Sequence, residues 1–208
     1  RAAGFEVTER ADASIGGIDA GISAFSRQLA DGGSGLIYVC GYAVDFSDRT
    51  FLLPNTARIS RPTDVMTQGV LAKSLLDTLG RARLKGGVAV FDLIRGPNNE
   101  PDPGIDALTA LPVNDEIGIV AVTHAAPRDQ PTPLVVALAT EIARPIVRLG
   151  SLITAIQSEM GALPATKIAA HFAAAPGFLV GAPAPPPPPP ASAPPASAPP
   201  PVIVPPVA

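Results

Sequence analysis

Apolar residues are arranged in two patterns along this chain. In residues 35–41, 86–93 and 117–122 nearly every position is apolar, which predicts strands that are covered on both faces. Elsewhere apolar residues recur every three or four positions, which predicts helices. These helices are expected over residues 14–31, 63–79, 133–142 and 145–160. Doubly buried strands that alternate with amphipathic helices indicate an α/β fold, a three-layer sandwich with a mostly parallel sheet and helices on both faces.

Shorter patterns predict the remaining elements. The alternation in Gly4–Arg10 is typical of a short strand, and residues 49–53 are expected to form a hairpin arm. Two further edge strands are expected over residues 165–172 and 178–180. Gly32 and Gly33 suit the left-handed conformation that closes a helix, so the first helix is expected to end before them.

Proline divides the chain into two parts. Of the 26 prolines in the 208 residues, 14 fall in residues 183–208. This Pro, Ala and Ser segment cannot bury enough apolar surface to offset the entropy lost on ordering it. We therefore predict a folded domain over residues 1–182 and a disordered tail, largely polyproline II, over residues 183–208. The tail is interpreted as a spacer, with a ligand for a proline-recognition module as the alternative.

Charge and residue usage exclude several classes of function. The chain has 15 Lys and Arg against 18 Asp and Glu, so no basic surface for nucleic acid is expected. One cysteine and two histidines argue against a disulfide framework and against most metal sites. No apolar run reaches the roughly 18 residues of a membrane span, and phosphate-loop and dinucleotide patterns are absent. We therefore expect no metal, no cofactor, no nucleic-acid partner and no membrane span.

Candidate chemistry is expected at the carboxyl ends of the predicted parallel strands, because sites form there in α/β folds. Residues 40–42, 92–95 and 123–124 meet this condition. Cys40 is a candidate nucleophile, and His124 is the histidine placed to serve as its base. The simpler interpretation of Cys40 is a small buried apolar residue.

Two of these segments resemble motifs of one enzyme family. The run GLIYVCGYAV (residues 35–44), followed by DRTFLLP (residues 48–54), resembles a strand ending in Gly-His-Gly and its following hairpin in bacterial caspase-like and metacaspase-like cysteine peptidases. The run GVAVFDLIR (residues 87–95), followed by Asn98 and Asn99, resembles the strand that ends in Asp-Ala-Cys-Arg in that family. The resemblance covers about residues 1–182 and implies a caspase-like fold.

The same resemblance implies that the catalytic dyad of the family is replaced. The family histidine aligns with Tyr42, and the nucleophilic cysteine aligns with Ile94. A phenol is a poor base at neutral pH, and a branched hydrocarbon cannot attack a carbonyl. Asp92 matches the acid that helps to shape a pocket for a basic substrate side chain. Its alternative interpretation is a capping or loop-bracing acid, paired with Arg95.

The resemblance also implies a strand that this sequence does not contain. In the family, a first strand and most of a first helix precede the position of Gly4, and that strand lies inside the sheet. Without it, a central position of the sheet would be open, with unpaired backbone groups. We therefore expect the native protein to extend upstream of Arg1.

Three hypotheses of function remain. The favoured one is a catalytically inactive caspase-like pseudo-peptidase that serves as a binding or scaffold module for a protein or peptide partner. The second is an active cysteine endopeptidase that uses Cys40 and His124 as a displaced pair. The third is an envelope or linker protein whose proline-rich tail is the functional part.

Overall fold

The computed structural model describes residues 5–29, 32–82, 84–94, 108, 117–124, 131–144, 147–161, 167–171 and 178–179. Several predicted features lie outside these residues. They are the tail over residues 183–208, the domain boundary at residue 182, Arg95, and the pair Asn98 and Asn99.

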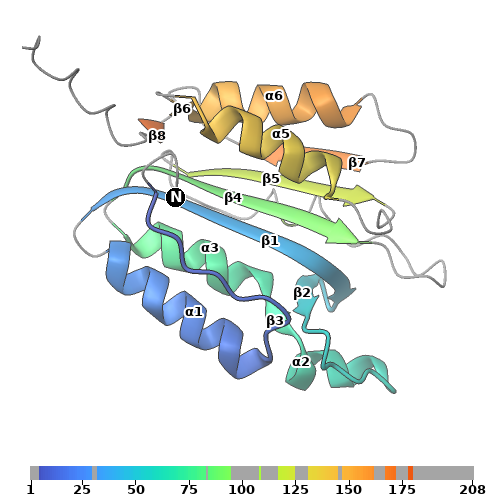
Figure 1. The fold of residues 1–208 in the computed structure, drawn as a ribbon. Coiled ribbons are helices and arrows are strands. Elements are labelled where there is room, and N and C mark those ends of the chain that lie inside the picture. Colours follow the sequence, from blue (N-terminus) through green and yellow to red (C-terminus); the bar gives the residue numbers. More distant parts are fainter. Residues whose placement is uncertain are drawn as a thin grey trace, which may run out of the picture.

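A mixed six-stranded sheet forms the centre of the molecule (Figure 1). Its strands follow the order β3-β2-β1-β4-β5-β7. Their bounds are β1 Gly33–Phe46, β2 Arg49–Leu53, β3 Val70–Leu71, β4 Leu84–Ile94, β5 Ile117–His124 and β7 Lys167–His171. β1, β4 and β5 are parallel to one another, whereas β2, β3 and β7 each pair antiparallel. The described residues are therefore α/β, as predicted. The sheet is mixed and not mostly parallel as expected, because three of its five strand pairings in the described chain are antiparallel and only those of β4 with β1 and β5 are parallel.

Helices cover both faces of this sheet (Figure 1). α1 and α3 lie on one face, and α5 and α6 lie on the other. The helix bounds are α1 Ile15–Gln28, α2 Val65–Gln68, α3 Ala72–Arg81, α5 Pro133–Ile142 and α6 Leu149–Gly161. None of the helices in the described ranges is long and apolar enough to cross a membrane.

The alternation of side chains along the central strands gives each face its own core. Ala89, Phe91 and Leu93 of β4 pack toward α1 and α3. Val88 and Val90 of the same strand pack toward α5 and α6. All five side chains are fully buried. A strand with a core on each face needs apolar residues at successive positions, which explains the apolar run that predicted β4.

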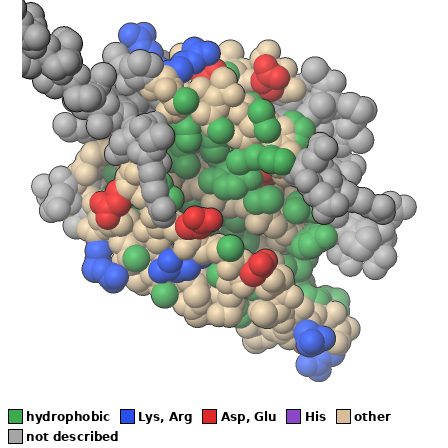
Figure 2. Space-filling view, viewed as in Figure 1, with side chains coloured by type: hydrophobic (Ala, Val, Ile, Leu, Met, Phe, Trp, Pro, Cys, Tyr) green, Lys and Arg blue, Asp and Glu red, His purple; other side chains and the backbone are tan. Residues whose placement is uncertain are grey.

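β1 has strand neighbours on both sides only near its carboxyl end. It pairs with β4 from Gly33 to Tyr42, but it pairs with β2 only from Tyr42 to Phe46. Along residues 35–41, the edge opposite β4 has no strand partner in the part of the chain that the structure describes. Figure 2 shows hydrophobic side chains gathered in the middle of the face that contains this edge.

Several local predictions are confirmed. Ser14 is the N-cap of α1, and its hydroxyl accepts a hydrogen bond from the backbone N–H of Gly17. After α1, Gly32 and Gly33 have positive φ angles of 81° and 116°, which favour glycine. The helix over residues 133–142, the hairpin arm over residues 49–53 and the edge strand within residues 165–172 are present as α5, β2 and β7.

The prediction of one helix over residues 63–79 is wrong. A 3-10 turn at Pro62–Asp64, then α2, β3 and α3 share this stretch. The break lies at Gly69, whose backbone is extended. A Cβ added there would come within 2.9 Å of the Cβ of Phe51 on β2. Glycine therefore lets the chain approach β2 closely enough for β3 to pair with it.

Three other predictions need correction. Residues 5–10, predicted as part of a strand, have no strand pairing, because a cavity separates this segment from β1. α6 begins at Leu149 instead of residue 145, since Val147–Arg148 form β6. β8 (Phe178–Leu179) pairs with β6 in a separate two-stranded sheet and does not extend the main one.

Candidate functional site

The candidate residues form two rows across the carboxyl ends of β1, β4 and β5. The first row consists of register partners Tyr42, Ile94 and His124. The second row, two residues earlier on each strand, consists of Cys40, Asp92 and Val122. The parallel register therefore brings the backbones of all the candidates predicted from the sequence to one end of the sheet.

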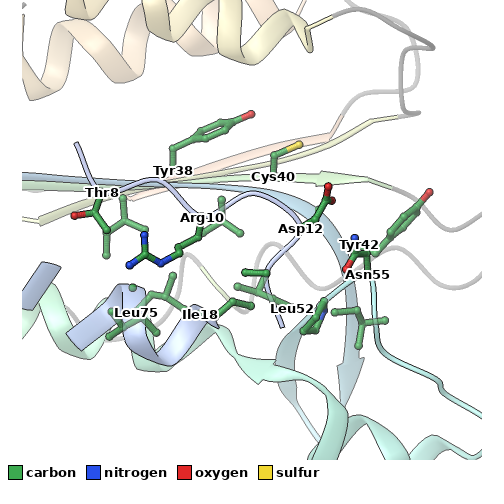
Figure 3. Close-up of a pocket in the computed structure, with 18 of the residues that line it drawn as sticks. Thr8, Arg10, Asp12, Ile18, Tyr38, Cys40, Tyr42, Leu52, Asn55 and Leu75 are labelled. Carbon is green, nitrogen blue, oxygen red and sulfur yellow. The ribbon is translucent and has the colours of Figure 1, made fainter. Parts of the chain in front are cut away.

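The second row faces α5 and α6. Val90 and Val122 pack into the core on that side, and Asp92 follows Val90 by two residues on a regular strand. In Figure 3, the side chains of Tyr38 and Cys40 point from β1 toward the same side, away from Ile18 of α1. Asp92 and Cys40 thus lie on the face that also carries the N-terminus of α5.

Asp92 is the centre of a buried hydrogen-bond cluster. Its Oδ2 accepts a hydrogen bond of 2.6 Å from the Tyr38 hydroxyl. The Thr132 hydroxyl donates to the same oxygen and accepts a bond of 3.2 Å from the backbone N–H of Val135. Because Thr132 is the N-cap of α5, the carboxylate of Asp92 joins β1, β4 and the start of that helix. Buried polar groups that are satisfied in this way hold their elements in one arrangement.

The sequence left two roles open for Asp92. The bracing role is supported by the contacts with Tyr38 and Thr132. The role in binding a basic substrate side chain needs a carboxylate that a ligand can reach, and the side chain of Asp92 is 0% exposed. That second role stays a prediction, and the suggested partner Arg95 lies outside the described residues.

The cluster raises the pKa of two neighbouring groups. Burial, the hydrogen bond to Asp92 and the charge of that carboxylate raise the pKa of Tyr38 far above its ordinary value. Partial burial of the sulfur, followed by the charge of Asp92, also raises the pKa of the Cys40 thiol, and the neighbouring Tyr38 hydroxyl opposes this shift. The thiolate is the nucleophilic form of cysteine, so these surroundings disfavour nucleophilic attack by Cys40 at neutral pH.

The interpretation of Cys40 as a small buried residue is wrong. Its side chain is exposed, although it lies in an apolar run. Among the described residues, β1 has no strand partner on the side opposite β4 along residues 35–41. An apolar run predicts burial only where both edges and both faces of the strand are occupied.

Tyr42 and Ile94 line one end of a cavity of about 470 Å³. Tyr42 keeps 46% of its surface exposed, and Asn55 completes this end of the cavity. From there the cavity follows β1 to Thr8 and Arg10 of the N-terminal segment (Figure 3). At its Tyr42 end the cavity offers a phenol, a hydrocarbon and an amide, which suit binding better than proton transfer or nucleophilic attack.

Cys40 and His124 lie in different rows on strands that are not neighbours. Two strand spacings and two residues separate their backbones, which corresponds to roughly 12 Å between Cα atoms. A nucleophile and its base must lie within hydrogen-bond distance of each other, about 3 Å, or be joined by one bridging water. The displaced pair stays a prediction that would have to bridge this separation.

Two residues of the site were missed by sequence reasoning. Tyr38 lies inside an apolar run, and nothing in the sequence links its hydroxyl to Asp92. Thr132 precedes Pro133, a pattern typical of a helix N-cap. That signal predicts the start of α5, but it does not predict a contact with β4, which lies 40 residues earlier in the chain.

Comparison with known proteins adds no relative. No protein-family model matches the chain, and no curated protein matches it. In the described ranges, no three His, Cys, Asp or Glu side chains are grouped so as to hold a metal ion. The functional conclusion therefore depends on the geometry of the two rows and the cavity.

Proposed function

We propose that this chain is a caspase-like pseudo-peptidase: a domain that binds a protein or peptide partner and does not cleave it. The observation that carries the proposal is the register of Tyr42 with Ile94 at the carboxyl ends of β1 and β4. These two positions align with the histidine and cysteine of caspase-like peptidases. They also line one cavity, so a ligand that enters it meets both side chains.

The chemistry of these two positions supports binding without cleavage. A phenol such as that of Tyr42 is a poor general base. The side chain of Ile94 has no lone pair with which to attack a carbonyl. The one thiol nearby, Cys40, has a raised pKa and therefore little thiolate at neutral pH.

Two features of the fold support the caspase-like part of the proposal. β1, β4 and β5 are parallel neighbours in chain order, and β2 returns antiparallel beside the end of β1, as the motif order of the family leads us to expect. The edge of β1 along residues 35–41 is unpaired in the described chain, at the position where the family has its first strand.

A test of catalysis should restore the dyad. We expect the unmodified chain to show no turnover of peptides with a basic residue before the scissile bond. We expect Tyr42→His combined with Ile94→Cys, in a Cys40→Ala background, to react with a peptide chloromethyl ketone at position 94. Ile94→Cys alone is the matched control, and its labelling should be about tenfold slower or less because it lacks a base. Turnover by the unmodified chain that Cys40→Ala abolishes would contradict the proposal and support the displaced pair.

A test of binding should use the exposed residue of the cavity. Peptides selected from a random library on the immobilised chain are expected to lose about tenfold in affinity for Tyr42→Ala, because an aromatic side chain at a binding surface contributes on this order. Ile59→Ala is the control, since Ile59 is also exposed but does not line the cavity. Equal losses for both variants, or no selectable peptide, would contradict a peptide-binding role.

A further inference from the structure

The edge of β1 along residues 36–41 offers backbone hydrogen bonds to a ligand. Within the described ranges, this edge pairs with no strand on the side opposite β4. The cavity of about 470 Å³ is lined by the same residues of β1. An extended peptide matches such an edge, because its N–H and C=O groups alternate with the same period as those of a strand. The edge therefore specifies the backbone of the ligand.

Two charged side chains of opposite sign line the cavity. Among the described residues that line it, the charged ones are Arg10 and Asp12. Both belong to the segment over residues 5–13, which runs in the same direction as β1 (Figure 1). In Figure 3, the side chain of Arg10 points toward Ile18 and Leu75, and that of Asp12 points away from them. A ligand that pairs with both must carry two separated charges of opposite sign.

Both charged groups are available to a ligand. Arg10 and Asp12 are exposed, and neither forms an ion pair with another of the described residues. One N–H of the Arg10 guanidinium donates to the carbonyl of Glu9 at 2.8 Å, which leaves further donors for a carboxylate. The stem of Arg10 lies against Gly21 of α1, where an added Cβ would come within 3.1 Å of the Arg10 Cγ. This contact with α1 positions the guanidinium beside the cavity.

We infer that the cavity binds a short peptide as a strand along β1, with the free amino group of the peptide at Asp12 and its free carboxylate at Arg10. Because Asp12 lies nearer the carboxyl end of β1 than Arg10 does, this peptide runs antiparallel to β1 (Figure 1). The Cα atoms of Arg10 and Asp12 are at most about 7 Å apart, and their diverging side chains lengthen the span between the charges. About three residues, roughly 10 Å when extended, fit this span. The inference rests on the proposed function, since it specifies the class of peptide that the cavity binds.

The walls of the cavity specify the side chains of this peptide. On the face of α1 and α3, the cavity is bounded by Ile18, Ile22 and Leu75. On the opposite face, Leu36 and Tyr38 line the cavity and pack against the core of α5 and α6. Successive side chains of an extended peptide point to opposite faces, so both kinds of position favour apolar residues. We therefore expect tripeptides of valine, isoleucine and leucine to bind.

The test titrates the 208-residue chain with a pool of synthetic tripeptides built from these three amino acids. The pool is prepared with free termini, with an acetylated amine or with an amidated carboxylate. We expect each blocking group to lower the affinity, measured by NMR titration, about fivefold, because it removes one charge of an ion pair at an exposed site. This preference should disappear in about 1 M salt, which screens charges beyond about 3 Å. Bound peptide should slow the deuterium exchange of the amides of residues 36–41 about tenfold.

Charge variants assign each end of the peptide to one residue. Asp12→Asn should lower the affinity for the free peptides about fivefold and abolish the effect of acetylation, while amidation still lowers the affinity. Arg10→Gln should abolish the effect of amidation and keep that of acetylation. Asp19→Asn and Arg27→Gln on α1 are the matched controls, because both residues are exposed and do not line the cavity. Neither control should alter the preference for free termini.

Four outcomes would overturn the inference. The blocked peptides bind as tightly as the free ones, or the two cavity variants behave like the controls on α1. Decanoate, a carboxylate with an apolar chain and no amine, binds more tightly than the free peptides. The amides of residues 36–41 are equally protected without peptide, which assigns the edge to another part of the polypeptide, or to a second copy if protection rises with protein concentration.

Failure of this inference is distinguishable from failure of the proposed function. Blocked peptides that bind as tightly as free ones leave the peptide-binding role standing and reject only the recognition of the two termini. A chain that binds neither these tripeptides nor any library peptide contradicts the peptide-binding role as well.

Discussion

Two isoleucines in one row of the sheet show that side chains on β1 and on β5 are buried to different degrees. Ile37 on β1 and Ile119 on β5 are both register partners of Ala89, and both contribute to the core under α1 and α3. Ile119 is fully buried, whereas Ile37 is only partly buried. β5 lies between β4 and β7, whereas within the described ranges β1 has no strand on its other side at this position. Strand neighbours, and not the side chain itself, decide how much apolar surface each residue buries.

The largest expected effect comes from truncating this pair. Ile119→Ala should lower the free energy of unfolding by about 4 kcal/mol, because it leaves a cavity in a closed core. Ile37→Ala should cost about 1–2 kcal/mol, because water already reaches part of its side chain. Urea unfolding of the 208-residue chain gives both values. Equal losses of unfolding free energy would show that the core is packed alike around Ile37 and Ile119.

The hydrogen-bond cluster around Asp92, which joins β1, β4 and the start of α5, should give the next largest effect on stability. Asp92→Ala removes the acceptor of two hydroxyl groups and should cost about 3 kcal/mol in unfolding free energy. Asp92→Asn keeps the shape and one acceptor oxygen, so its cost should be about half as large. Urea unfolding of both variants, with Thr132→Val as a third, measures the contribution of the cluster. If Asp92→Ala is no more costly than Asp92→Asn, the carboxylate does not brace β1 and α5.

The smallest effect concerns the ionisation of Cys40 on β1. Because burial and then the charge of Asp92 raise its pKa, alkylation by iodoacetamide should keep accelerating as the pH rises past the ordinary thiol value. Asp92→Asn should lower this pKa and speed alkylation at pH 8 several-fold. The raised pKa also means that the folded chain holds this proton more tightly than the unfolded chain. Its contribution to stability is therefore complete below the ordinary thiol pKa and is lost as pH rises through the raised value.

The pH profile of alkylation, measured on the folded chain and on the same chain in urea, checks both statements. Ile59→Cys in a Cys40→Ala background is the control, since it places a thiol at an exposed site outside the hydrogen-bond cluster of Asp92. An equal pKa for Cys40 in the folded and unfolded chain would contradict the placement of its thiol beside Asp92.

The strands and helices that follow from a local apolar pattern were predictable from sequence, whereas features that depend on contacts between distant segments were not. The apolar runs of β4 and β5 are explained by a core on each face, so their pattern identified them correctly. The break at Gly69 depends on its approach to Phe51, a contact between segments that no local pattern encodes. Residues 5–10 have the alternation of a strand, but they pair with no strand in the part of the chain that the structure describes.

The candidate site was likewise predictable in its strand positions and not in its side-chain contacts. The positions of Tyr42, Ile94, Cys40 and Asp92 at one end of the sheet follow from the strand order that the sequence predicts for an α/β fold. The partners of Asp92 do not, because the hydroxyls of Tyr38 and Thr132 reach it from a neighbouring strand and from a helix start. Contacts between elements that are distant in the sequence depend on how those elements pack together. Local sequence patterns do not specify this packing.

The hydroxyl of Thr132 restricts which residues evolution can place at the start of α5. Its one proton points to Asp92, and its oxygen accepts from Val135, so the position requires a side chain that donates and accepts at once. Serine meets this requirement, and asparagine meets it with its amide group. Aspartate, an equally good N-cap elsewhere, would place a second negative charge beside Asp92. Among natural relatives of this chain, position 132 should therefore vary among threonine, serine and asparagine and exclude aspartate wherever position 92 is acidic.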